Sequence, residues 1–63
     1  MTRAEAKAAM EAGRKIGWGD GRYCFYKLDH DYGPYVFVGT DGSMRRMDGS
    51  WDNLDDAFIL PEL

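Results

Sequence analysis

Residues 35–47, with the sequence YVFVGTDGSMRRM, carry the clearest structural signal in this 63-residue chain. The segments 35–39 and 43–47 are rich in residues that favour strands. Between them, Asp41-Gly42 can adopt the positive φ angles that a tight hairpin turn requires. The stretch therefore predicts a β-hairpin.

The alternation of side chains along this hairpin has a consequence for its arginines. Successive residues of a strand point to opposite faces, so Arg45 and Arg46 must face different sides of the sheet. In the first strand, Val36 and Val38 share one face, and aromatic residues occupy the other. At least one arginine is therefore expected to border an aromatic surface.

The amino-terminal segment 2–12 predicts the only helix. Thr2 and Glu5 have the spacing of a capping box, and Gly13 lies where a left-handed carboxyl-terminal cap is wanted. The residues at core-facing spacing are Ala6, Ala9 and Met10. A stripe made mostly of alanine lets a helix approach a sheet closely, so this helix is expected to lie on the strands.

Three further segments read as strands: 14–18, 22–28 and 57–60, with a helical turn at 51–56. Alternating glycines at 17–21 predict a turn with positive φ angles. Segment 22–28 is apolar or aromatic on both faces, so both faces need cover: the helix can cover one face, and a second subunit or a flat ligand could cover the other. The expected fold is α+β, one amino-terminal helix packed on a small antiparallel sheet of about four strands, in a single domain, 1–63.

Size and composition narrow the class of protein. A domain of this length buries only about 60% of the surface of its unfolded chain, and its single Cys24 allows no internal disulfide. Self-association into a homo-oligomer is the expected support. The start is charged and alanine-rich, and no run approaches about 20 apolar residues, so a cytoplasmic protein without membrane contact is predicted. The net charge of −3 argues against direct nucleic-acid binding.

Residues that could carry chemistry favour structural interpretations. His30 between two aspartates lacks the spacing of known metal motifs, and Cys24 lies in a predicted strand with no evident base. Ser43 and Ser50 are not in a nucleophile elbow. The sequence therefore predicts a protein without catalytic residues, metal or cofactor.

A ligand site is predicted instead from aromatic and arginine residues. Planar rings stack on bases, and guanidinium groups bind phosphate through paired hydrogen bonds. The predicted ligand-binding residues are Trp18, Arg22, Tyr23, Arg45, Arg46 and Trp51. The alternatives are that the rings belong to the core and that the arginines form surface ion pairs.

An acidic cluster near the carboxyl terminus allows a second interpretation. Asp48 begins it, and Asp52, Asp55 and Asp56 are the residues that could meet a basic protein surface. A solvated rim at a charged helix end is the alternative.

The order of elements resembles that of the small phage proteins of the Thoeris anti-defence sponge family. The resemblance covers about half of the chain and rests on Gly13-Arg14-Lys15-Ile16 leading to Trp18, and on Trp51 followed by Leu54-Asp55-Asp56-Ala57-Phe58. It implies an α+β subunit of a homo-oligomer that sequesters cyclic nucleotide or cyclic ADP-ribose type immune signals without cleaving them. Trp18 would be the matching aromatic residue, and Trp51 with Asp55 would lie in the matching closing segment.

This chain departs from the family pattern in two places. Ile16-Gly17-Trp18 stands where the family usually carries more basic residues, and the middle section is shorter and richer in Asp-Gly turns. The functional hypothesis is a non-catalytic, phage-type anti-defence binding protein for a nucleotide-like ligand in the host bacterial cytoplasm. The alternative hypothesis is an anti-CRISPR-like inhibitor whose acidic and aromatic surface blocks a host defence protein.

Overall fold

Helix α1 spans Arg3–Glu11 of the computed structural model, which describes residues 1–47, 51 and 54–61. The Glu5 backbone N–H donates to Thr2 Oγ1 at 3.1 Å, and the Thr2 N–H donates to Glu5 Oε1 at 2.8 Å. The predicted capping box is thus confirmed. Gly13 follows the helix with a φ of 92°, the left-handed conformation expected at this position.

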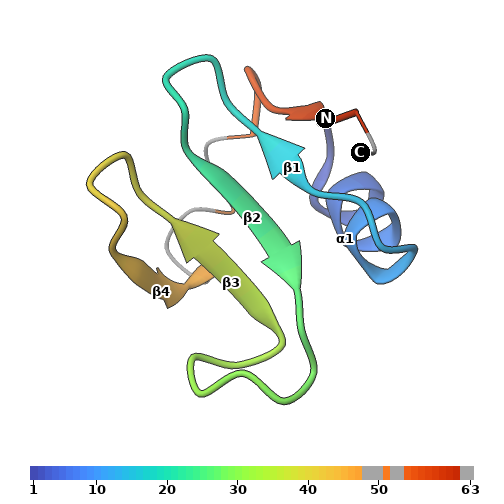
Figure 1. The fold of residues 1–63 in the computed structure, drawn as a ribbon. Helices are drawn as coiled ribbons and strands as arrows, with labels where there is room; N and C mark the ends of the chain where they lie inside the picture. Colours follow the sequence, from blue (N-terminus) through green and yellow to red (C-terminus); the bar gives the residue numbers. More distant parts are fainter. Residues whose placement is uncertain (48–50, 52–53, 62–63) are drawn as a thin grey trace.

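The strands form one antiparallel sheet of five, in the order β4-β3-β2-β1-β5 (Figure 1). Their bounds are Ile16–Gly17 for β1, Tyr23–Tyr26 for β2, Tyr35–Val38 for β3, Met44–Arg46 for β4 and Phe58–Ile59 for β5. The expected helix on an antiparallel sheet is present, but the expected number of about four strands is wrong. The sheet gains its fifth strand because the short β5 pairs with β1, which is distant from it in the sequence.

Strand β2 is shorter than the predicted 22–28. The Lys27 N–H donates to the Pro34 carbonyl at 2.9 Å, and the His30 N–H donates to the Lys27 carbonyl at 3.2 Å. These bonds turn the chain into a loop, so Leu28 is 77% exposed instead of lying on a strand face. Of the alternating glycines around this turn, Gly21 has the predicted positive φ, whereas Gly17 and Gly19 do not; Gly17 lies in β1 itself.

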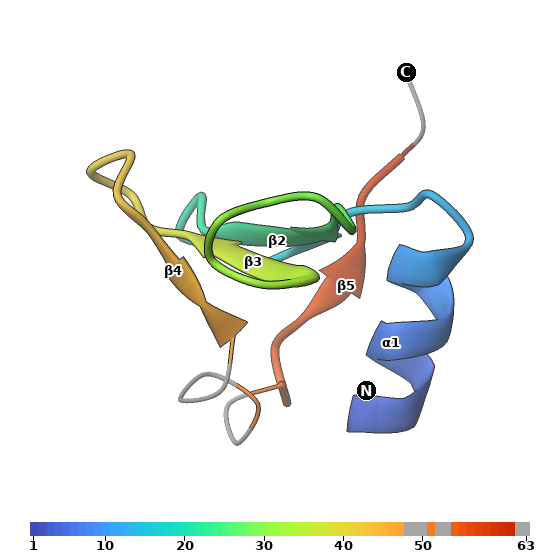
Figure 2. The ribbon, with the colours of Figure 1, turned by 90° about the horizontal axis from the view of Figure 1, so that it is seen from below.

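The main core lies between α1 and the sheet. Helix α1 contacts β1 and β2 on one face of the sheet, as Figure 2 shows from below. Of the predicted core-facing stripe, Ala6 and Met10 are buried and Ala9 is partly buried against the core. The buried core residues are Ala6, Met10, Ile16, Trp18, Cys24, Phe37, Met47, Trp51 and Leu54.

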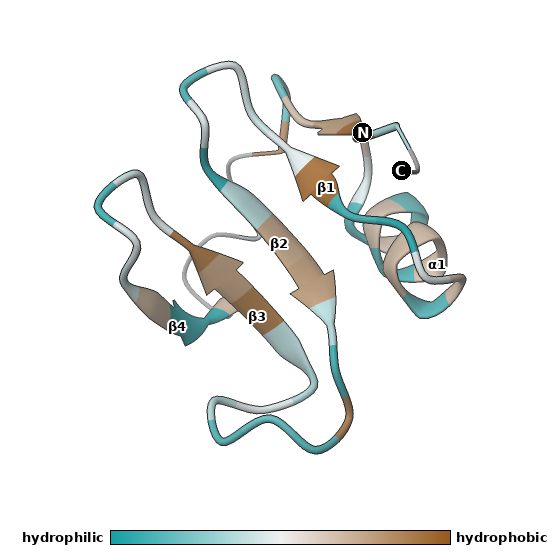
Figure 3. Ribbon diagram, viewed as in Figure 1, coloured by the Kyte–Doolittle hydropathy of each residue, from teal (hydrophilic) through white to brown (hydrophobic). Residues whose placement is uncertain are grey.

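The opposite face of the sheet is also apolar, as predicted for β2. Figure 3 shows hydrophobic residues running along β1, β2 and β3, while hydrophilic residues appear at the end of β4. Val36 and Val38 are buried although they alternate with the core-facing Phe37. The loop after β2 folds back towards this face, and the ring centroids of His30 and Phe25 are 6.1 Å apart. This loop therefore contributes to the cover of the second face.

None of the helical segments in the described part of the chain is long and apolar enough to cross a membrane.

Candidate functional site

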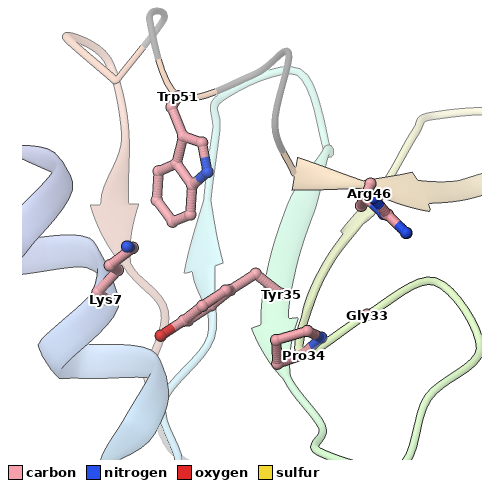
Figure 4. Close-up of a pocket in the computed structure, with 6 residues that line it drawn as sticks. All are labelled: Lys7, Gly33, Pro34, Tyr35, Arg46 and Trp51. Carbon is pink, nitrogen blue, oxygen red and sulfur yellow. The ribbon is translucent and has the colours of Figure 1, made fainter.

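The predicted ligand-binding residues divide between two surface pockets. Arg46 and Trp51 line the first, a pocket of about 450 Å³ (Figure 4). We call it the cationic pocket; its lining residues are Lys7, Gly33, Pro34, Tyr35, Arg46 and Trp51. The lining residues come from α1, from β3 and the loop before it, from β4, and from Trp51.

Two aromatic rings form the centre of the cationic pocket. The Tyr35 and Trp51 ring centroids are 5.7 Å apart in an edge-to-face arrangement. Lys7 Nζ lies 5.4 Å from the Tyr35 centroid and 5.7 Å from the Trp51 centroid. Trp51 is only 9% exposed, so it supplies a wall of the pocket and not an open stacking face.

The charge of this pocket is opposite to that of the whole chain. Lys7 and Arg46 line it, and the described lining residues include no carboxylate, although the protein has a net charge of −3. Figure 4 shows the two cations on either side of Tyr35 and Trp51. Lys7 is the cation that lies against both rings, whereas Arg46, which is opposite Val36, borders the pocket from the other face of the sheet.

Tyr35 adds a neutral hydroxyl to this surface. Its pKa is raised above the usual value of 10.0, first by burial and then by the negative charge of Glu11. The hydroxyl consequently keeps its proton at neutral pH. The hydroxyl already makes a hydrogen bond with the Glu11 carboxylate, to which it donates, so only its acceptor capacity is left for a ligand.

The second pocket contains the other predicted tryptophan. It measures about 320 Å³ and is lined by Trp18, Gly19, Asp20, Arg22, Asp56 and Phe58; we call it the acidic pocket. Arg22 Nε lies 2.6 Å from Asp20 Oδ2, and the guanidinium lies 5.5 Å from the Trp18 centroid. Arg22 therefore forms an ion pair, which was the alternative to phosphate binding that the sequence allowed for the arginines.

Tyr23 and Arg45 line neither pocket. Tyr23 stacks on Phe25 at 6.2 Å, and Lys15 Nζ lies 5.4 Å from its ring. Arg45 is opposite Phe37 in the β3–β4 register and places its guanidinium 5.2 Å from that ring. Since Arg46 is opposite Val36, the two arginines face different sides of the sheet, as predicted.

The predicted acidic surface is described only in part. Asp55 and Asp56 are exposed in a turn before β5, where the Ala57 N–H donates to the Leu54 carbonyl at 3.1 Å. Asp48 and Asp52 lie outside the described residues. Binding of a partner protein by Asp52, Asp55 and Asp56 stays a prediction.

The residues considered for chemistry have structural surroundings. Burial raises the pKa of the Cys24 thiol to about 12, so it is protonated at neutral pH. His30 Nδ1 accepts a hydrogen bond from the Tyr32 N–H at 3.2 Å within the loop. Across residues 1–47, 51 and 54–61, no group of three or more His, Cys, Asp or Glu residues could hold a metal ion.

The sequence prediction missed Lys7, Gly33, Pro34 and Tyr35 as pocket residues. Tyr35 was considered with the other aromatic residues as a possible stacking surface but was not among the predicted ligand-binding residues, and Lys7 was predicted to be a solvent-exposed position of the helix. A useful signal is the spacing of Arg3 and Lys7, which places two cations on one side of α1. Both side chains reach Trp51, since the Arg3 guanidinium is 5.7 Å from its ring.

Comparison with known proteins gave no matching family model, no matching curated protein and no matching solved structure.

Proposed function

We propose that this chain is a non-catalytic binding protein that captures a nucleotide-type anion in the cationic pocket. The observation that carries the proposal is the placement of Lys7 and Arg46 on either side of the Tyr35–Trp51 pair. Lysine and arginine donate charge-assisted hydrogen bonds to phosphate oxygens, and aromatic rings contact the faces and edges of a base. The combination suits a ligand with one planar ring and at least one phosphate.

The dimensions of the pocket limit the ligand. Small-molecule pockets commonly measure about 300–1,000 Å³, and the cationic pocket, at about 450 Å³, is in the lower part of this range. It suits one nucleotide unit better than an extended dinucleotide. A cyclic mononucleotide or the compact ring of cyclic ADP-ribose has the required size and charge.

In this proposal the protein holds the ligand and breaks no bond. The biological role that agrees with such binding is the sequestration of a cyclic nucleotide or cyclic ADP-ribose type immune signal. This role comes from the sequence resemblance to the anti-defence sponge proteins, while the pocket residues supply its physical basis.

The test is a native mass spectrum and calorimetric titration with 3′,5′-cyclic AMP, 3′,5′-cyclic GMP and cyclic ADP-ribose. We expect one ligand per chain for at least one of these probes. Lys7→Gln and Arg46→Gln should each weaken binding by about tenfold or more, because a hydrogen bond to a charged group contributes about 1.5–3 kcal/mol.

Arg45→Gln provides the matched control. It removes the same charge from the adjacent residue, whose side chain lies over Phe37 outside the pocket. Binding should therefore be retained in this variant. Absence of binding by all three probes, or equal losses in the Arg45 and Arg46 variants, would contradict the proposal.

A further inference from the structure

The turns at 20–22 and 41–43 are each held by an aspartate that accepts the backbone N–H two residues further along the chain. The Arg22 N–H donates to Asp20 Oδ1 at 3.1 Å, and the Ser43 N–H donates to Asp41 Oδ1 at 3.0 Å. Hydrogen bonds from the Ser43 hydroxyl and N–H lower the pKa of the Asp41 carboxyl. This carboxylate therefore stays an ionised acceptor in mild acid.

The turn at 30–32 has the same kind of bond with a different acceptor. The Tyr32 N–H donates to His30 Nδ1 at 3.2 Å, and His30 is the one histidine of the chain. Nδ1 accepts only while it carries no proton, because a protonated imidazole has two N–H donors and no acceptor. Histidine is also the side chain that ordinarily changes charge between about pH 5 and pH 8. Mild acid can therefore break the bond at 30–32 and leave those at 20–22 and 41–43 in place.

The loop that contains His30 also forms a wall of the cationic pocket. The Gly33 N–H donates to the His30 carbonyl at 3.1 Å, and Gly33 has a φ of 98°. Gly33 and Pro34 line the pocket together with Arg46. A Cβ built on Gly33 would lie 3.8 Å from Arg46 Cγ and 3.9 Å from its Nε, so the arginine side chain lies along this part of the loop. The turn at 30–32 thus positions a residue that borders the pocket.

The surroundings of His30 contain few charged groups. Its ring centroid is 6.1 Å from that of Phe25 on β2 and 5.3 Å from that of Tyr32. The charged residues near it are Lys27, Asp29 and Asp31 of its own loop, and Arg46 beside Gly33. The two carboxylates attract a protonated ring, whereas the two cations and the Tyr32 N–H repel it. His30 is not among the described residues that line the pocket, so its charge acts on a ligand less directly than its hydrogen bond does.

We propose that His30 is a pH-sensitive switch in the wall of the cationic pocket. The neutral ring, with its proton on Nε2, holds Tyr32 and Gly33 in the arrangement that binds ligand. A proton taken up by Nδ1 in acid releases them. The switch regulates the site proposed above and rests on that proposed function.

The change is confined to residues 31–33. The Lys27 N–H still donates to the Pro34 carbonyl at 2.9 Å, and the His30 N–H to the Lys27 carbonyl at 3.2 Å, because neither bond involves the imidazole. Loss of one hydrogen bond should weaken ligand binding about threefold at about pH 5 relative to about pH 8. By linkage, bound ligand should lower the midpoint of the His30 titration by about 0.5 pH unit.

The first experiment follows the loop without ligand, in ¹⁵N-correlated spectra of the full chain from about pH 5 to about pH 8. The Tyr32 and Gly33 amide resonances should titrate together with the His30 ring, whereas the Arg22 and Ser43 amides of the aspartate turns should not move. A long-range ¹H–¹⁵N spectrum should show Nδ1 as the unprotonated nitrogen of the neutral ring. Tyr32 and Gly33 amides that do not titrate, or a neutral ring with its proton on Nδ1, would overturn the proposal.

Two variants separate the loss of the hydrogen bond from the gain of charge. His30→Asn keeps an acceptor for the Tyr32 N–H and cannot become charged, because asparagine forms the same type of turn. Its Tyr32 and Gly33 amides should not titrate. His30→Ala has neither acceptor nor charge, so its Gly33 amide should differ from that of His30→Asn in the direction in which acid moves the unmodified chain. If the two variants agree, charge alone moves the amide and the proposal is wrong.

The second experiment is calorimetric titration with 3′,5′-cyclic AMP, 3′,5′-cyclic GMP and cyclic ADP-ribose at the same two pH values. A probe that binds should lose about threefold in affinity in acid with the unmodified chain. It should bind His30→Asn equally at both values, which controls for titration of the probe itself. An equal loss in both proteins, or the tighter binding in acid that charge alone would give, would overturn the proposal.

The two experiments keep the switch distinct from the proposed function. Failure of all three probes at both pH values would contradict the proposed function. The amide titration of Tyr32 and Gly33 decides the switch in that case as well, since it requires no ligand.

Discussion

The two tryptophans have similar neighbours but opposite electrostatic surroundings. Trp18 lies beside Arg22, whose charge is paired with Asp20 at 2.6 Å. Trp51 lies beside Lys7 and Arg3, in a pocket whose described lining contains no carboxylate. A tryptophan next to a cation is therefore not sufficient to define an anion site; the nearest carboxylates decide what the pocket can bind.

Both tryptophans contact aromatic residues of β3. Trp18 contacts Phe37 at 5.5 Å and Trp51 contacts Tyr35 at 5.7 Å, both edge-to-face. Because each indole N–H gives its own resonance, an ¹⁵N-correlated spectrum reports on the acidic pocket through Trp18 and on the cationic pocket through Trp51. Each of the following changes uses this pair of signals.

The largest effect is expected from Phe37→Ala. Phe37 is fully buried and contacts Trp18, Arg22 and Arg45. Its loss should cost about 3–5 kcal/mol, a large fraction of the stability of a small domain. Urea titration should show both indole signals changing in one shared transition at a much lower midpoint. Separate transitions would show that the two pockets unfold independently.

Gly17→Ala should affect the acidic pocket and spare the cationic one. A Cβ at this position would lie 2.8 Å from Leu60 Cδ2 and 2.9 Å from its Cγ, so the side chain must shift. Overpacking of this kind typically costs about 1–3 kcal/mol. The Trp18 resonance should move while the Trp51 resonance stays. Gly19→Ala serves as the control because a Cβ there meets nothing within 4 Å.

Thr2→Ala perturbs the opposite region. Thr2 caps α1, which carries Lys7, and the loss of such a cap costs about 1 kcal/mol. The Trp51 resonance should respond, whereas Trp18 should be unaffected. Thr2→Ser keeps the hydroxyl and should behave like the unmodified chain. An equal response of both indoles would argue against a local role of the cap.

Asp20→Asn combined with Asp56→Asn should make the acidic pocket resemble the cationic one. The Asp20–Arg22 pair is partly exposed, so its loss should change stability by no more than about 1 kcal/mol. With Arg22 released, 3′,5′-cyclic AMP should shift the Trp18 resonance weakly at millimolar concentration. If the Trp18 resonance of this variant does not shift, carboxylates alone do not explain why the two pockets differ in anion binding.

Strong acid should produce the smallest change, and it should begin at α1. The Glu5 carboxylate accepts a hydrogen bond from the Thr2 backbone N–H and makes another with the Thr2 hydroxyl. Both bonds lower the pKa of Glu5 below its usual value of 4.5. A depressed folded-state pKa means that the contribution to stability is fully present above pH 4.5 and is lost as the pH falls through the folded value. The Trp51 resonance should therefore titrate below pH 4.5, and Glu5→Gln should remove this step.

Local features of the fold were predictable because their causes lie within a few residues. Thr2 and Glu5 are one helical turn apart, and Gly42 in the β3–β4 turn has the positive φ of 84° that the Asp-Gly pair indicated. The facing of Arg45 and Arg46 follows from strand alternation alone. Leu28 was misplaced because the predicted strand did not account for the loop bonds made by Lys27.

The cationic pocket was less predictable because its parts are distant in the sequence. No local pattern brings Lys7 of α1 to Tyr35 and Trp51; the packing of α1 on the sheet does so. Trp18 and Trp51 line different pockets for the same reason, since the folded sheet and not the local sequence decides where each tryptophan lies. Aromatic and arginine composition identified Trp51 and Arg46 but not the lysine beside them.

The strand order also bears on the speed of folding. Strands β1 to β4 each pair with their neighbours in sequence, whereas β5 pairs with the distant β1, and the Met1 amino group donates to the Leu54 carbonyl 53 residues away. Closing long loops is entropically costly before contacts repay it. We therefore expect the meander of β1 to β4 to form early and the contact between the two ends of the chain to form last, so the final step should set the folding rate.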